Sequence, residues 1–396
     1  MASSDPNVMA PSVGTAVPEG WIRLIGLSIL TSPASALGTI MPTLVTSFVA
    51  RGVPLSIAGV LGAAEMIGMT LIQFCAPLFI TRYNRRVLAG IAVGLAVGGQ
   101  LFSVLTDDAA ILGGLRVVAG IGEGCLFSLA IASLAGTSDP DRAFGVALAS
   151  GQIFCTVMLV VMASLSIRNP TQGAIGVFAL FIMTTTLCIS TLPGRDAVPL
   201  RALAHGGTRW SIYNVPAICG LMGMFLLSCA LGSVWPIVGQ IAASRGVQPS
   251  VIATGFSVAG FGGMSGALVA AVLAIRFGRL LPLFLASAGY AACLILIDSQ
   301  LSFPMLAFLL LFFALACIPY YMGVLAWIDA SGRLSVISGA MIPLGIAVSE
   351  ALAGSVVAAA GFRGATFEGC GFVLVAFVLM LVATRLKPPP ADLSKT

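Results

Sequence analysis

The sequence predicts an all-α membrane protein whose twelve transmembrane helices form two six-helix repeats. Three observations lead to this fold class. Of 396 residues, 59% are hydrophobic and only 8% charged, the apolar residues fall into twelve stretches, and the two halves match at a fixed offset. A soluble domain carries about 25% charged residues, so this chain lacks the polar groups that would cover a surface facing water. Soluble enzymes and nucleic-acid-binding proteins are therefore excluded.

Each apolar stretch is long enough for one crossing, which takes about 20 residues. In chain order the stretches cover residues 21–49, 54–80, 87–106, 109–136, 143–167, 171–192, 212–244, 249–275, 280–297, 302–328, 335–360 and 364–384. The polar segment 193–211 is the longest connection. It separates a predicted six-helix bundle at 21–192 from a second at 212–386, and the tails are 1–20 and 387–396.

Lys and Arg residues are distributed unevenly over the predicted loops. If both termini face the cytoplasm, fourteen of the nineteen lie on the cytoplasmic side and four on the outer side, and Arg116 lies within a helix. Cytoplasmic loops carry the excess of basic residues in membrane proteins. The sequence therefore predicts a multi-pass protein of the cell inner (plasma) membrane with cytoplasmic termini. This topology explains the net charge of +5 without a nucleic-acid partner.

An internal repeat appears when the chain is aligned with itself at an offset of 194 positions. Residues 36–42 then fall on 230–236, and both segments end in proline. The same offset places Arg51, Arg82 and Arg85 on Arg245, Arg276 and Arg279. Charged and proline matches carry weight because both residue types are rare within these stretches. Parallel repeats of this kind enclose a binding site between two halves, which rock to give alternating access.

Six-plus-six helices with this repeat resemble the major facilitator superfamily over essentially the whole chain. The family motif R-x-x-x-G-x-G on the fourth helix corresponds to Arg116, Gly120 and Gly122. The family's loop motif, G-x-x-x-D-R-x-G-R-R, corresponds to residues 77–86, where its three basic positions are Arg82, Arg85 and Arg86.

The loop motif departs from the family at both of its glycines, which are Pro77 and Asn84 here. It also departs at its acidic position, which is Thr81 here and Ile275 in the second copy. The resemblance implies a conformational loop built from these basic residues, but the family's charge lock between helices lacks its Asp. Two interpretations stay open, a latch between helices or a topology signal that binds lipid headgroups. The conformational candidates are Arg82, Arg85, Arg86, Arg276 and Arg279.

Three carboxylates lie deep within apolar stretches, namely Glu65, Glu123 and Glu350. A charged side chain at the centre of a bilayer costs about 2.5–3.5 kcal/mol even on insertion scales, so such residues are functional candidates. Arg116 precedes Glu123 by two helical turns and shares its helix face. We therefore expect these four residues to take part in proton coupling. The alternative is a static Arg–Glu pair that fixes helix packing.

Substrate candidates are polar and aromatic residues within the stretches. The resemblance implies that the first, fourth, seventh and tenth helices line the cavity. The candidates are Trp235, Gln240, Tyr320 and Tyr321, together with Gln152 on the fifth helix. The alternative for each is packing or a position in the interfacial aromatic belt.

No Walker motif is present, and nine Cys and one His show no metal-ligand spacing, so no ATP, cofactor or metal is predicted. The expected function is a secondary active transporter, not an enzyme, which moves a small organic solute with protons. The pattern of acids and aromatics favours efflux of amphipathic drug-like compounds or metabolites. One alternative is uptake by a proton symporter of an organic or aromatic acid, with Arg116 as its anchor. Others are a channel and a transport-inactive receptor or scaffold. A monomer is expected.

Overall fold

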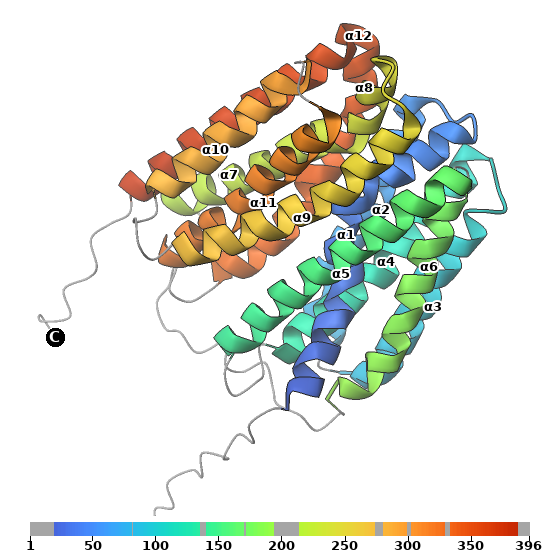
Figure 1. The fold of residues 1–396 in the computed structure, drawn as a ribbon. Coiled ribbons are helices and arrows are strands. Elements are labelled where there is room, and N and C mark those ends of the chain that lie inside the picture. Colours follow the sequence, from blue (N-terminus) through green and yellow to red (C-terminus); the bar gives the residue numbers. More distant parts are fainter. Residues whose placement is uncertain are drawn as a thin grey trace, which may run out of the picture.

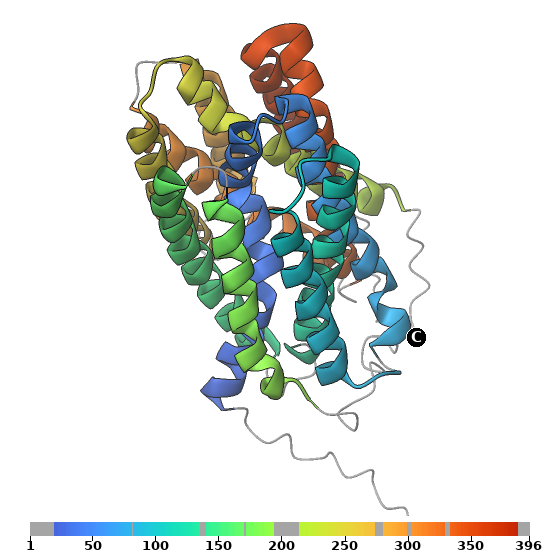
Figure 2. The ribbon, with the colours of Figure 1, turned by 90° about the vertical axis from the view of Figure 1, so that its right-hand side faces the viewer.

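A computed structural model describes residues 20–80, 82–134, 140–169, 172–193, 214–273, 280–298, 302–328 and 333–386. All regular elements within these ranges are helices, arranged in two groups that lie side by side (Figures 1 and 2). The predicted tails except Gly20, and all but the first residue of the segment 193–211, lie outside the described residues, as do Arg276 and Arg279. The division of the chain into bundles at that segment stays a prediction.

The first group runs from α1 to η1. Its elements are α1 (Trp21–Ala50), α2 (Leu55–Phe79), α3 (Arg85–Phe102), α4 (Ala109–Leu134), α5 (Pro140–Arg168), α6 (Gly173–Thr184) and η1 (Thr185–Thr191). The second group comprises α7 (Val215–Val234), η3 (Trp235–Ile237), α8 (Val238–Ser244), α9 (Pro249–Leu273), α10 (Leu280–Ile295), η4 (Leu296–Asp298), α11 (Phe303–Ile328) and α12 (Arg333–Arg385).

The offset found in the sequence reappears in the helix bounds. Adding 194 to the bounds of α2 gives those of α9, and adding it to the bounds of α4 gives those of α11. The turns match as well, because Gly52 and Gly246 have the positive φ angles +84° and +78° that favour glycine. The predicted repeat is therefore confirmed.

The 53-residue helix α12 contains a sharp turn at Gly361, where φ is +67° and ψ is −176°. As one straight helix it would measure about 80 Å, far more than the ~30 Å core of a bilayer. The turn separates the two stretches that the sequence predicts at 335–360 and 364–384. Within the described residues, nine helices are long and apolar enough to cross a membrane, and two shorter apolar helices lie in α5 and α10. The count of twelve crossings stays a prediction.

Large apolar side chains cover the outside of the described bundle. Leu187 is 81% exposed, Leu105 79% and Phe367 70%. Such exposure would promote aggregation of a protein in water, but it is what lipid tails require of a membrane protein. Proline within helices is accommodated locally. Because Pro33 has no N–H to offer the Ile29 carbonyl, the Ser32 hydroxyl donates to that oxygen instead.

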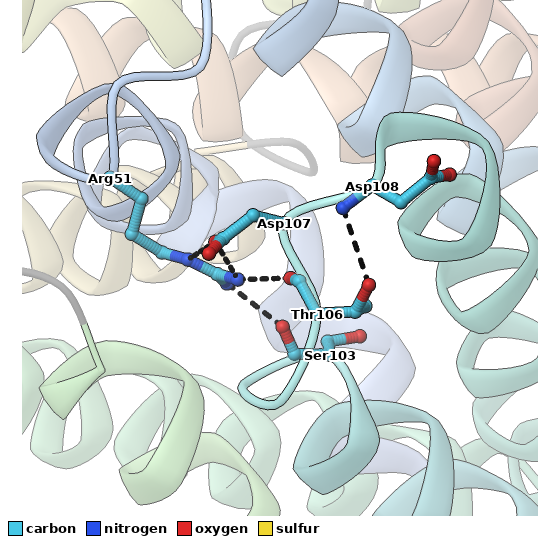
Figure 3. Close-up of polar contacts among 5 residues, drawn as sticks. All are labelled: Arg51, Ser103, Thr106, Asp107 and Asp108. Atoms are coloured by element: carbon cyan, nitrogen blue, oxygen red, sulfur yellow. Dashed lines mark hydrogen bonds and ion pairs between the residues drawn. The ribbon is translucent and has the colours of Figure 1, made fainter.

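We call the end of the bundle with the turns at Gly52, Gly246 and Gly361 the outer end, which the sequence predicts to face away from the cytoplasm. At this end Arg51 holds the loop between α3 and α4 (Figure 3). Its guanidinium donates to the Ser103 carbonyl at 2.8 Å and to the Thr106 carbonyl, and it pairs with the Asp107 carboxylate at 2.8 Å. The α2–α12 and α5–α9 crossings connect the two groups, together with contacts of α1 with η3 and α8.

Candidate functional site

Four polar side chains from three helices of the first group form one buried cluster. Glu65 of α2 pairs with Arg116 of α4, and Gln100 of α3 donates to the Glu65 carboxylate at 2.7 Å and to the Glu123 carboxylate at 3.1 Å. None of the four is more than 1% exposed. The structure thus brings together three of the four predicted proton-coupling residues and adds Gln100, an amide that the sequence analysis did not assign to a site.

Glycines of α4 explain why the three helices approach so closely. A Cβ atom on Gly120 would collide with the Glu65 carbonyl of α2, and one on Gly122 would lie 2.5 Å from the Ala96 nitrogen of α3. These are the two glycines of the R-x-x-x-G-x-G motif. Their missing side chains let neighbouring backbones pack against α4 on two sides, which brings Glu65 and Gln100 within reach of Arg116 and Glu123.

This cluster has no net charge only when one proton is bound to its two carboxyl groups. Arg116 keeps its positive charge in any protein environment, whereas the two carboxyl groups together can contribute zero, one or two negative charges. Arg116 also lies over the Phe48 ring, with 5.8 Å between the guanidinium carbon and the ring centre. A net charge in a site without water is costly, so one carboxylate and one carboxylic acid beside the guanidinium form the favoured arrangement.

The second half of the chain shows that this packing does not require charged groups. At the offset of 194 positions, the four cluster residues correspond to Ala259, Leu294, Leu310 and Cys317. All four counterparts are buried, each no more than 4% exposed, in the matching helices α9, α10 and α11. The same helix arrangement therefore forms around ordinary apolar side chains, which argues against a purely structural role for the charged cluster.

Glu350 on α12 lies beside this cluster but belongs to the other group of helices. Its side chain is 1% exposed, and neither carboxyl oxygen has a hydrogen-bond partner among the described residues. It faces α2, because a Cβ atom on Gly62 would lie 3.0 Å from its Oε2 atom. Glu65 follows Gly62 by one helical turn, so Glu350 comes within electrostatic reach of the cluster across the boundary between the two groups.

The substrate candidates occupy separate places. Trp235 in η3 is 3% exposed and donates from Nε1 to the Thr39 carbonyl of α1 at 2.9 Å, a contact between the two groups. Tyr320 and Tyr321 on α11 are buried within the second group, whereas Gln240 on α8 is half-buried. No hydrogen bond or ring contact links these four side chains among the described residues. The side chain of Gln152 lies outside them.

The basic residues of the predicted conformational loop make contacts within the first group. Arg85 is buried and donates to the Ser133 hydroxyl of α4 at 3.2 Å. Arg86 donates to the Leu192 carbonyl at 3.0 Å, just beyond the end of η1. Arg82 is exposed. These contacts fix α3 against α4 and η1, and the counterparts Arg276 and Arg279 lie outside the described residues.

No model of a known protein family matches this sequence, and no curated protein is significantly similar to it. Solved structures do match its fold. A D-xylose-proton symporter has a TM-score of 0.69 and 15% identity, covering 93% of this chain and 97% of the symporter. A variant of the nucleoside transporter NupG has a TM-score of 0.68 and 13% identity, covering 92% of this chain and 98% of NupG. The fold expected from the resemblance to the major facilitator superfamily is thus confirmed.

Proposed function

We propose that this chain is a secondary active transporter that couples the movement of protons to that of a small organic solute. The observation that carries the proposal is the cluster of Glu65, Arg116 and Glu123, a buried site whose charge balances with one proton. Its apolar counterparts in the second half indicate that the cluster is retained for more than packing. The fold shared with a proton symporter and a nucleoside transporter supports the same conclusion.

The cluster suggests how proton binding drives the cycle. With one proton bound, the charges of Glu65, Arg116 and Glu123 cancel, and the helices can pack without water. Loss of the proton leaves a net negative charge in a dry site, which favours a rearrangement that admits water or a cation. Because α2 also contacts α12 of the other group, a shift of Glu65 is transmitted to the boundary between the two halves.

The direction we favour is uptake by symport rather than efflux. Efflux was expected because three acids and several aromatics would make a cavity attractive to cations. In the structure, Glu65 is bound to Arg116 and Gln100, Glu123 accepts from Gln100, and Glu350 packs against α2. All three carboxyl groups are buried, so none of them is open to a cationic solute. The physical reason for efflux is therefore weakened, and the matching symporter favours uptake.

Reconstituted vesicles provide the test. Purified protein in liposomes is given an inward proton gradient, and the accumulation of radiolabelled D-xylose, uridine and benzoate is measured, with ethidium as a probe of the opposite direction. We expect saturable accumulation of one of the first three solutes that collapses when a protonophore removes the gradient. The matched control is Glu123→Gln, which retains the size of the side chain but cannot release a proton.

Four outcomes contradict parts of the proposal. Flux that never saturates indicates a channel, because a carrier must bind its solute in each cycle. Gradient-driven accumulation that is unchanged in Glu123→Gln excludes the cluster as the proton site. Ethidium movement against its gradient, with no accumulation of the other probes, restores efflux. Absence of flux for every probe supports the receptor or scaffold alternative.

A further inference from the structure

The internal repeat relates the two main crossings between the groups of helices. At the offset of 194 positions, α5 corresponds to the first part of α12, and α9 corresponds to α2, so the α5–α9 crossing is the counterpart of the α2–α12 crossing. The same offset pairs Thr156 on α5 with Glu350 on α12. One position in the repeat is thus a neutral hydroxyl at one crossing and a carboxyl group at the other.

At the α5–α9 crossing the polar group is satisfied. The Thr156 hydroxyl donates to the Gly260 carbonyl of α9 at 3.1 Å. A Cβ atom on Gly260 would lie 3.1 Å from the Thr156 Cα atom, so the backbones meet closely at this hydrogen bond. Nothing in this contact between Thr156 and Gly260 changes its charge with pH.

At the α2–α12 crossing the carboxyl group of Glu350 is buried without a hydrogen-bond partner among the described residues. The backbones pack tightly on either side of it. A Cβ atom on Gly59 would lie 2.5 Å from the main-chain oxygen of Glu350, and one on Gly354 would collide with Ser56. A carboxylate buried here would lose its hydration without gaining a hydrogen bond from the described part of the chain, so the closed crossing favours the protonated acid.

The ionisable surroundings of Glu350 add to this preference. From α2, the acidic residue is Glu65, one helical turn from Gly62, and a negative charge on Glu65 disfavours a second negative charge nearby. From α1, the uncharged sulfur of Met41 approaches the same Cβ position of Gly62 as the Glu350 carboxyl group. The helices α7, α10 and α11, which also pack against α12, contain no Asp, Glu, Lys, Arg or His within their described bounds.

The contacts of Ser56, Thr39 and Thr156 between the two groups of helices lie in the outer half of those helices. Ser56 is the second residue of α2, and Thr39 and Thr156 lie 11 and 12 residues before the ends of α1 and α5. In the alternating-access cycle, these contacts close the outer end and must separate when that end opens. Separation of α2 from α12 would expose Glu350 to water, where a carboxylate is stable.

We propose that Glu350 is a proton-binding site that controls opening of the outer end, because it must be protonated for α2 and α12 to close. The site deepens the proposed function and rests on it. When Glu350 gives its proton to water on the outer side, its charge keeps the crossing open. When it takes up a proton, the crossing can close. The α5–α9 crossing, with Thr156, lacks this dependence.

The test measures the outer end directly, without any solute. Nitroxide labels are attached to cysteines introduced at Leu105 and Gln248, which are exposed near the outer ends of the two groups, in a variant without the native cysteines. Double electron–electron resonance then measures the distances between the two labels in liposomes between about pH 5.5 and about pH 8.5. The distance distribution gives the ratio of open to closed protein. Hydrogen exchange of α2 and α12 in the unlabelled protein, corrected for intrinsic rates, serves as the second measurement should the cysteine-free variant not fold.

We expect the open-to-closed ratio to rise with pH, by at most about tenfold per pH unit for one proton. Glu350→Thr, which copies the counterpart position, and Glu350→Gln should both reduce this rise, leaving only the slope contributed by the cluster of Glu65 and Glu123, and should favour the closed outer end. Thr156→Val should weaken closure at every pH but leave the slope unchanged. A slope in Glu350→Thr equal to that of the natural protein would overturn the inference, as would a flat response in the natural protein. Vesicle uptake that depends on Glu123 would still support the proposed function in both cases.

Discussion

Arg51 and Arg245 make the same contact in the two halves of the chain. Each donates to the main-chain carbonyl that lies 52 residues further along, Ser103 for the first and Ile297 for the second. Each also precedes a glycine with positive φ. The repeat has therefore preserved the way in which an outer turn is tied to the end of the third helix of its half. Arg51 also forms an ion pair with the Asp107 carboxylate.

The shared contact of Arg51 and Arg245 with a main-chain carbonyl predicts which interaction of Arg51 stabilises the protein. The Asp107 side chain is 82% exposed, so its ion pair with Arg51 is screened, and Asp107→Asn should change the free energy of unfolding by less than about 1 kcal/mol. Arg51→Ala removes hydrogen bonds from two carbonyls and should cost about 1–3 kcal/mol. Thermal unfolding of both variants in detergent checks the order. Equal losses of stability in the two variants would show that the ion pair with Asp107, rather than the hydrogen bonds to the carbonyls, stabilises this turn.

The apolar counterparts of the buried cluster predict that its charges can be removed together. The variant Glu65→Ala, Gln100→Leu, Arg116→Leu and Glu123→Ala should fold with a stability equal to the natural protein or up to about 4 kcal/mol higher, since apolar replacements of a buried ion pair are often neutral or stabilising. Thermal unfolding measures the stability, and vesicle uptake should show the loss of proton coupling.

The single variant Arg116→Leu is the control for this combined replacement. It leaves Glu65 without its partner in a dry site, and breaking one side of a buried pair costs about 3–5 kcal/mol. If the fourfold variant fails to fold, or is no more stable than Arg116→Leu, the charges are structural and the cluster is not a dispensable proton site.

Much of the fold could be predicted because the signals in this sequence are local and strong. Apolar runs predicted the helix bounds to within a few residues, from α1 to the turn at Gly361, and the rare Arg and Pro residues revealed the repeat. The pairing of Arg116 with carboxylates also followed from physical chemistry, because a permanent charge in oil needs a partner.

The choice of partner could not be predicted. Seven residues separate Arg116 from Glu123 on one helix face, but Arg116 pairs with Glu65 of another helix, and Gln100 bridges the two acids. Which helices meet depends on the packing of Gly120 and Gly122 against distant parts of the chain. The position of Trp235 at a contact with Thr39 has the same cause, since helical spacing alone does not distinguish a cavity from a boundary between halves.

Replacement of Glu123 separates proton coupling from solute movement. Glu123→Gln cannot lose a proton, so the cluster stays permanently neutral and the solute-loaded cycle can still run. We expect gradient-driven accumulation to fall by at least about tenfold and its dependence on pH to flatten, because the free energy of the proton gradient no longer enters the cycle. Exchange of labelled for unlabelled solute across vesicles without a gradient should persist. A loss of exchange equal to the loss of accumulation would mean that Glu123 is needed for solute binding or movement as such.

Close packing at Gly354 predicts that a single methyl group prevents closure of the outer end. A Cβ atom there would collide with the Ser56 Cα atom, which belongs to the α2 backbone and cannot turn aside as a side chain would. Gly354→Ala should therefore shift the protein towards the outward-open form, at a cost to the closed form of about 1–3 kcal/mol. The matched control is Gly371→Ala on the same helix, where the added methyl group meets nothing within 4 Å. Nitroxide distances across the outer end should lengthen only for Gly354→Ala, and they should do so at every pH, because the obstruction is steric. Unchanged distances would mean that α2 and α12 do not form the outer closure.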